Sequence, residues 1–236
     1  MIGMSAQSNP VVAYGPDVPT EQELRLLGDL KGKRILELGC GAGGAAVAFA
    51  RQGATVIAID ASPAALKAAR TLADRSEVRV EWHEGDLADL AFLRADSVDV
   101  VFSAEAVGRV DDIGRIFRQV HRVLRPHGAF LFSYEHPLAL CIGRGASTTP
   151  GANAPPELPL GGVELRRSYF DDTPLVVDDE ANPVTLYPRT ISSVFMGLNR
   201  AGFRVEVLAE PAPLASVDAQ PVVPPTIVWR ARKEGA

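Results

Sequence analysis

A glycine-rich stretch at residues 34–44, Arg-Ile-Leu-Glu-Leu-Gly-Cys-Gly-Ala-Gly-Gly, limits the possible folds more than any other part of the chain. The apolar residues at 35, 36 and 38 indicate a buried strand. The glycines predict a tight turn, and the alanine-rich segment 45–52 predicts a helix. A turn without side chains lets a ligand approach the backbone, and the start of a helix offers unpaired N–H groups. We therefore expect a nucleotide-like cofactor to bind at this turn.

The spacing of the glycines alone does not identify the cofactor. Gly39, Gly41 and Gly44 satisfy the G-x-G-x-x-G pattern, and Asp60 follows at about the distance found in dinucleotide-binding proteins. Glu37, however, places a carboxylate two residues before the first glycine. A carboxylate repels the phosphates of NAD and attracts a cationic ligand. Glu37 therefore favours a positively charged cofactor over NAD.

The run Glu37-x-Gly39-x-Gly41-x-Gly43 closely resembles motif I of the class I S-adenosylmethionine (SAM) methyltransferases. SAM carries a sulfonium, an ammonium and no phosphate, so an acidic pocket suits it. The resemblance extends over residues 14–135 and more loosely over residues 185–233. It implies an α/β fold of three layers, Rossmann-like, with a seven-stranded mostly parallel sheet whose last strand is antiparallel. It also implies SAM as the cofactor and S-adenosylhomocysteine (SAH) as the product.

Apolar patterning predicts the order of the elements along the chain. We expect strands at 35–38, 55–59, 78–82, 97–103, 129–134, 203–208 and 226–231, and helices at 21–30, 45–52, 63–74, 112–124 and 191–200. Thr20 and Glu23 form a capping-box pattern at the start of the first helix. The last helix is followed by two strands with no helix between them, which predicts an antiparallel final pair.

Composition narrows the class of protein. The chain has 236 residues, 47% of them hydrophobic, which suits one α/β domain over residues 1–236. A net charge of −5 disfavours nucleic-acid binding. Two cysteines cannot form a disulfide framework, which fits a reducing cytoplasm. We see no signal peptide, no apolar run long enough to span a membrane and no metal-ligand pattern.

The resemblance assigns cofactor contacts in chain order. Asp60 ends a strand and would accept the ribose hydroxyls, although it also suits the N-cap of the following helix. Asp86 would accept from the adenine amine, and the Leu87 N–H would donate to the ring. Cys40 is a small residue tolerated in the turn rather than a nucleophile. Tyr14 resembles a tyrosine that closes over SAM in many relatives, although packing at the domain edge is an equal alternative. The full predicted set is Tyr14, Glu37, Gly39, Cys40, Gly41, Gly43, Asp60, Ala61, Asp86, Leu87, Ser103 and Ala104.

The catalytic residues are less clearly indicated. Many relatives continue after the fourth strand with a His-His pair, where this chain has Gly108 and Arg109, so one common general base is missing. His136 follows the fifth strand and titrates near neutrality, which makes it our candidate base. Glu135 would orient it or bind a substrate cation, and Arg189 would pair with an acidic substrate group. A base, a substrate binder and a scaffold all remain open as roles for this cluster.

Residues 138–186 have no match in the family pattern. Gly, Pro, Ser and Thr are frequent in residues 138–162, which indicates a loop. A short hairpin is expected from residues 166–170 and 175–177 around a turn at 171–174. Ligands of open α/β sheets bind beyond the carboxyl ends of the strands. We therefore expect this insertion to form a lid over a small substrate, with a disordered linker as the alternative.

The sequence thus predicts a cytoplasmic enzyme that transfers a methyl group from SAM to a hydroxyl, amine or carbon of a small molecule, in secondary metabolism. Three alternatives remain. One is a methyltransferase acting on RNA or protein, and another is a SAM-binding protein that no longer transfers methyl groups, cyclase-like or regulatory. The least favoured is an NAD-dependent oxidoreductase. No nucleic acid or membrane partner is expected.

Overall fold

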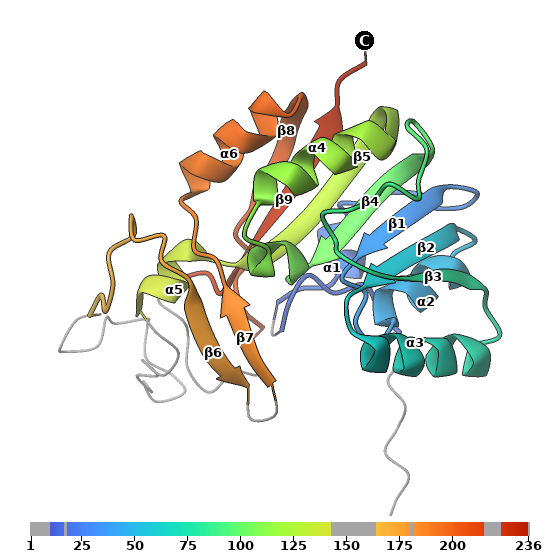
Figure 1. Ribbon diagram of the computed structural model, residues 1–236, viewed down its shortest axis with the longest axis horizontal. Coiled ribbons are helices and arrows are strands. Elements are labelled where there is room, and N and C mark those ends of the chain that lie inside the picture. The colour runs from blue at the N-terminus through green and yellow to red at the C-terminus, as the bar shows by residue number, and fades with distance from the viewer. Residues whose placement is uncertain (1–9, 17, 143–163, 180–181, 215–222, 236) are drawn as a thin grey trace, which may run out of the picture.

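A computed structural model describes residues 10–16, 18–142, 164–179, 182–214 and 223–235 (Figure 1). Its helices are α1 (Glu21–Leu24), α2 (Gly44–Arg51), α3 (Pro63–Arg75), α4 (Ile113–Val123), α5 (Pro137–Ile142) and α6 (Ile191–Arg200), with a 3-10 helix η1 (Ala106–Arg109). Its strands are β1 (Arg34–Leu38), β2 (Thr55–Asp60), β3 (Val80–Glu84), β4 (Val98–Ala104), β5 (Leu124–Glu135), β6 (Leu175–Asp179), β7 (Asn182–Leu186), β8 (Phe203–Ala209) and β9 (Thr226–Lys233). None of the described helices is both long and apolar enough to cross a membrane.

Seven strands form one sheet in the order β3-β2-β1-β4-β5-β9-β8. The pairs from β3 to β5 are parallel, and β9 is antiparallel to both of its neighbours, β5 and β8. The chain goes from α6 to the edge strand β8 and returns as β9, with no helix in the described residues 210–214 and 223–225 between them, and β9 runs antiparallel to β8. The predicted sheet and its antiparallel last strand are confirmed.

Helices cover both faces of the sheet and make three layers (Figure 1). One face is buried under α2, α3 and the N-terminal segment, in a core that includes Tyr14, Phe49 and Phe102. The other face is buried under α4 and α6, in a core that includes Phe117 and Trp229. Because both faces are covered, the central strands read as continuous apolar runs rather than alternating ones.

The order of the strands fixes where a ligand binds. β1 lies in the middle of the sheet and pairs with β2 on one side and with β4 on the other. The chain therefore leaves β1 and β4 toward opposite sides, and a crevice opens outside the carboxyl ends of these two strands. The glycine turn follows β1 directly, and η1 follows β4. The α5 helix and the β6–β7 hairpin lie beyond this end of β4 and β5 in Figure 1.

The predicted helix at 21–30 is wrong in its length. The capping box of Thr20 and Glu23 is present, but α1 ends after one turn, at Leu24. The carboxylate of Glu21 accepts hydrogen bonds from the backbone N–H groups of Leu26 and Leu27, at 3.0 and 2.7 Å. These bonds satisfy N–H groups that a longer helix would direct to carbonyls four residues earlier.

The predicted hairpin in the insertion is also wrong in its pairing. β6 pairs with β7, from Leu175 opposite Leu186 onward, and not with residues 166–170. The earlier segment instead turns back on itself, because the Arg167 guanidinium binds the backbone oxygens of Asp171 and Thr173, each at 2.9 Å. The predicted loop at 138–162 lies mostly outside the described residues; residues 138–142 belong to α5.

Candidate functional site

The turn after β1 contains three glycines whose φ angles are positive, a conformation that other residues rarely adopt. Gly39 has φ +73°, and a Cβ atom there would lie 2.2 Å from the Cβ of Ala106 in η1. Gly43 has φ +83° and begins α2. A Cβ at Gly41, with φ +51°, would meet no atom within 4 Å. The turn is therefore tightly packed at its first glycine and open at its second, where a ligand has room to approach the backbone.

Asp60 holds this turn in place. Its Oδ2 accepts from the N–H of Gly41 at 2.8 Å, and its Oδ1 accepts from the N–H of Ser62 at 2.9 Å. The N-cap of α3 is Ser62 rather than Asp60, since the Ser62 hydroxyl accepts from the N–H of Ala65 at 3.2 Å. Each carboxylate oxygen accepts more than one hydrogen bond. Asp60 therefore retains acceptor capacity for ribose hydroxyls beside the open part of the turn.

Glu37 is the unusual group of the site. Its side chain is 4% exposed, and the N–H of Ala46 donates to it. Its Oε2 is buried and has no hydrogen-bond partner among the described residues. Burial, and to a lesser extent the negative charge of Asp60, raises the pKa of Glu37 to about 8. An unpartnered carboxylate at this depth indicates that a polar or cationic ligand group completes the site.

The remaining predicted cofactor residues fall into two groups. Asp86 is exposed, and its Oδ1 accepts from the N–H of Ala88 at 2.9 Å, while the Leu87 side chain lies against Gly39. These residues thus lie beside the glycine turn, as does Ala61, which follows Asp60 directly. The Ser103 hydroxyl, by contrast, is fully buried and donates to the carbonyl of Leu38 at 2.9 Å. Ser103 therefore joins β4 to β1, and Ala104 ends β4 beside it.

Tyr14 and Cys40 are buried in the core. The hydroxyl of Tyr14 donates to Glu21 at 2.5 Å, and its carbonyl accepts from the Ser133 hydroxyl at 2.5 Å. Its ring packs on Phe102. In this position Tyr14 anchors the N-terminal segment and presents no side-chain surface to a ligand. Burial raises the pKa of the Cys40 thiol, so Cys40 stays protonated and unreactive.

His136, the predicted general base, is held at the end of β5 by hydrogen bonds, and its catalytic role stays a prediction. Its side chain is 1% exposed. Its Nδ1 accepts from the N–H of Leu138 at 3.2 Å, so the ring proton is on Nε2, which donates to Glu210 at 2.8 Å. Its backbone N–H donates to the carbonyl of Pro225 at 2.9 Å. Both ring nitrogens are thus occupied, and His136 connects the end of β5 to the segment before β9.

Arg189 is likewise held by hydrogen bonds, and its predicted pairing with an acidic substrate group stays a prediction. Its Nη1 donates to the carbonyl of Tyr187 at 2.9 Å, and its Nη2 donates to the carbonyls of Val110 and Asp111. Burial lowers the pKa of Arg189. These bonds hold the start of α6 against the segment after η1. Arg189 also lines a cavity of about 320 Å³ between the starts of α4 and α6.

Glu135, the last residue of β5, is half-buried and lies against η1. A Cβ atom at Gly108 would lie 3.2 Å from Oε2 of Glu135 and 2.9 Å from the Cβ of Tyr134. The carbonyl of Gly108 accepts from the N–H of Tyr187 at 2.9 Å. Gly108 thus brings together η1, the end of β5 and the residue after β7. Sequence reasoning noted Gly108 only as a departure from the family, whereas the structure shows that its missing side chain leaves room for the Glu135 carboxylate.

The end of β4 carries a conformational signal that sequence reasoning missed. Glu105 has φ +62° and ψ −28°, which is unusual for a residue other than glycine. Its N–H donates to the carbonyl of Ser133 at 2.9 Å, and its carboxylate pairs with Arg109 at 3.5 Å. Such strained residues cluster at functional sites. No local sequence pattern predicts this conformation.

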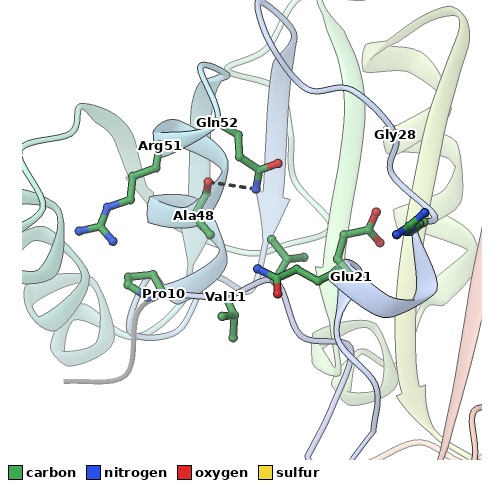
Figure 2. A pocket seen from close by; sticks show the side chains of 10 residues that line it. Pro10, Val11, Glu21, Gly28, Ala48, Arg51 and Gln52 are labelled. Atoms are coloured by element: carbon green, nitrogen blue, oxygen red, sulfur yellow. Dashed lines mark hydrogen bonds between the residues drawn. The ribbon is translucent and has the colours of Figure 1, made fainter. Parts of the chain in front are cut away.

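A cavity of about 530 Å³ lies elsewhere, between the N-terminal segment and the second half of α2 (Figure 2). Pro10, Glu21 and Arg51 are among its lining residues, and Gln52 there donates to the carbonyl of Ala48 at 3.2 Å. The predicted cofactor residues are absent from its lining among the described residues. Glu21, in this lining, already accepts from the Tyr14 hydroxyl and from two backbone N–H groups.

Comparison with known proteins agrees with this geometry. Residues 36–132 match a family model described as a methyltransferase domain. An S-adenosylmethionine dependent methyltransferase from Mesorhizobium loti has a crystal structure with a TM-score of 0.73 and 28% identity, over 89% of this chain and 96% of that one. Residues 36–132 thus form a methyltransferase domain, and the chain has the fold of the class I SAM-dependent methyltransferases.

Curated relatives of this methyltransferase domain have small-molecule names. A ubiquinone biosynthesis O-methyltransferase of Azorhizobium caulinodans is 35% identical over 111 residues, which are 47% of this chain and 44% of that protein. A magnesium-protoporphyrin O-methyltransferase of Rhodobacter capsulatus is 37% identical over 110 residues, which are 46% of this chain and 48% of that protein. The chain therefore spans about half the length of the curated relatives it matches.

The residues of the site fit SAM, the cofactor of this family. The open turn at Gly41 gives access to backbone N–H groups at the start of α2, and Glu37 contributes the buried carboxylate that a cationic cofactor requires. The open turn would also suit a pyrophosphate, whereas a carboxylate at Glu37 would repel one. The predicted preference for SAM over NAD is therefore confirmed by the family match, and the Glu37 geometry gives its physical reason.

Proposed function

We propose that the protein catalyses methyl transfer from SAM to a small-molecule acceptor. The observation that carries this proposal is the buried Oε2 of Glu37, which has no partner among the described residues and lies beside an open glycine turn. The printed names of the curated relatives support a small acceptor. Two of those names refer to O-methylation, which makes a hydroxyl or carboxyl oxygen the first acceptor atom to test.

The chain's own residues would act mainly by orientation. When bound, SAM supplies an electrophilic methyl group. Glu37 and Asp60 would hold the cofactor from β1 and β2, and the acceptor would enter from the side of η1 and β5. Holding two reactants in line contributes roughly 7–11 kcal/mol to a bimolecular reaction. Both ring nitrogens of His136 are hydrogen-bonded, so this proposal gives the chain's residues the task of orientation and assigns no proton transfer.

We further propose that the insertion at 138–186 covers the acceptor and that the protein acts in the cytoplasm. The first proposal is supported by the contact between Tyr187 and Gly108, which ties the end of the insertion to η1. The second is supported by the free thiols of Cys40 and Cys141. Methyl transfer to RNA is disfavoured by the net charge of −5.

Parallel calorimetric titrations with SAM, SAH and NAD test the cofactor, and SAH formation with a panel of small acceptors tests the reaction. We expect micromolar affinity for SAM and SAH and none for NAD. SAM binding without SAH formation on any acceptor would favour the alternative of a SAM-binding protein that transfers no methyl group. NAD binding alone would contradict the proposed function outright.

A further inference from the structure

We propose that Glu135 binds a cationic group of the methyl acceptor and thereby selects amine-bearing acceptors. The proposal rests on the proposed function, because it assumes that the acceptor meets the cofactor outside the ends of β4 and β5. Glu135 is the last residue of β5 and pairs with Thr226 of β9. Its carboxylate is thus at the strand end that neighbours β4, where the crevice of the sheet opens.

The space around the carboxylate is a property of this chain. Oε2 of Glu135 lies 3.2 Å from the position that a Cβ of Gly108 would occupy. Gly108 itself is held on both sides, by the contact with Tyr134 and by the hydrogen bond from the N–H of Tyr187 at 2.9 Å. A side chain at position 108 would displace the carboxylate. The geometry therefore keeps Glu135 in a defined half-buried position instead of leaving it free in solvent.

The carboxylate has no ion pair or hydrogen bond among the described residues, although several cations lie in the same region. Arg189 is bound by three carbonyl oxygens, and Arg109 pairs with Glu105 at 3.5 Å. His136, the next residue, is bound to Glu210. Arg189, Arg109 and His136 are therefore each bound to other groups, and the Glu135 carboxylate has no partner among the described residues.

The charge of the surrounding strand ends favours the same kind of ligand. The side chains of Asp60, Asp86 and Glu105 end or follow neighbouring strands of the sheet. Such a group of like charges attracts cations and repels anions. An anionic acceptor would meet this repulsion at Glu135, where the neighbouring Arg109 and Arg189 are already bound to other groups. An ammonium group would be attracted and would form a charge-assisted hydrogen bond with Glu135.

Matched ligands that differ in charge test the proposal by calorimetry on the protein saturated with SAH. Dopamine, 4-ethylcatechol and 3,4-dihydroxyphenylacetate share a catechol and carry a positive, neutral and negative side chain, and hexylamine and hexanol form an aliphatic pair. We expect each amine to bind roughly tenfold more tightly than its neutral counterpart, as a charge-assisted hydrogen bond predicts. Glu135→Gln should remove this preference. The control Glu77→Gln, an exposed residue before β3, should retain it.

The outcomes separate this proposal from the proposed function. Three results would overturn the role of Glu135 and leave the cofactor assignment intact, provided that SAH binds. They are equal affinities for amines and neutral ligands, no measurable binding of either amine, and a preference for amines that persists in Glu135→Gln. Absence of SAH binding would overturn the proposed function and this proposal together. Circular dichroism of both variants verifies that they fold. If Glu135 acted only as a base, Glu135→Gln would reduce turnover without changing the charge preference in binding.

Discussion

The replacement Glu37→Gln should change how the stability of the protein depends on pH. The pKa of Glu37 is about 8 in the folded protein, against a usual value of 4.5, because the side chain is buried. Between these values the folded protein retains a proton that the unfolded chain has released, so the free energy of unfolding falls as pH rises. The loss approaches about 1.4 kcal/mol for each pH unit and ends above pH 8, where both states are ionised.

Glutamine has nearly the same shape and does not titrate, so it removes this dependence. We expect the difference in unfolding free energy between Glu37→Gln and the wild type to grow by about 2.5 kcal/mol in favour of the variant between about pH 5 and pH 7. Urea unfolding of both proteins over this range measures it, and other titrating groups cancel in the difference. A constant difference across the range would refute the buried, protonated state of Glu37.

The same carboxyl should link cofactor binding to proton release. A cationic cofactor favours the ionised form of Glu37, so binding should expel the proton and affinity should rise with pH below about pH 7.5, where the cofactor's own amino group stays charged. Calorimetry in two buffers of different ionisation enthalpy measures the released proton directly. Glu37→Gln should abolish the release. Equal proton release by the variant would show that another group titrates.

Three further predictions concern the glycine turn, Asp60 and His136. Gly39→Ala should destabilise the protein by more than about 2 kcal/mol, because it adds positive-φ strain to a clash with Ala106. Gly41→Ala meets no neighbouring atom and should cost about 1 kcal/mol or a little more. Urea unfolding measures both costs, and equal values would contradict the packing at Gly39. Asp60→Ala should weaken SAM binding and destabilise the turn by about 1–3 kcal/mol, and unchanged calorimetric affinity would exclude a role in binding the ribose. His136→Ala should lower the free energy of unfolding by about 2–3 kcal/mol. The pH profile of turnover should stay unchanged in this variant. If the profile instead loses an ionisation near neutrality, the result supports His136 as the base.

The sequence predicted well the features that depend on local chemistry. The glycine turn follows from the steric needs of Gly39 and Gly43, and the antiparallel β9 was predicted from two strand patterns that follow each other without a helix pattern between them. The length of α1 was not predictable, because it depends on the side chain of Glu21 turning back to bind two later N–H groups. The β6–β7 pairing was missed because strand patterns alone do not specify which strand pairs with which.

The catalytic residues were harder to predict for a related reason: a sequence shows which groups can titrate, and only tertiary contacts show which of them are already bound. His136 and Arg189 have suitable chemistry and positions, yet Glu210 and three backbone carbonyls occupy them. Burial has the opposite consequence at Glu37, where a polar atom left without a partner marks a site that a ligand completes. In this fold, a polar side chain without a hydrogen-bond partner is therefore the better guide to a ligand site. By this criterion we assign Glu37 to the cofactor and propose Glu135 for the acceptor.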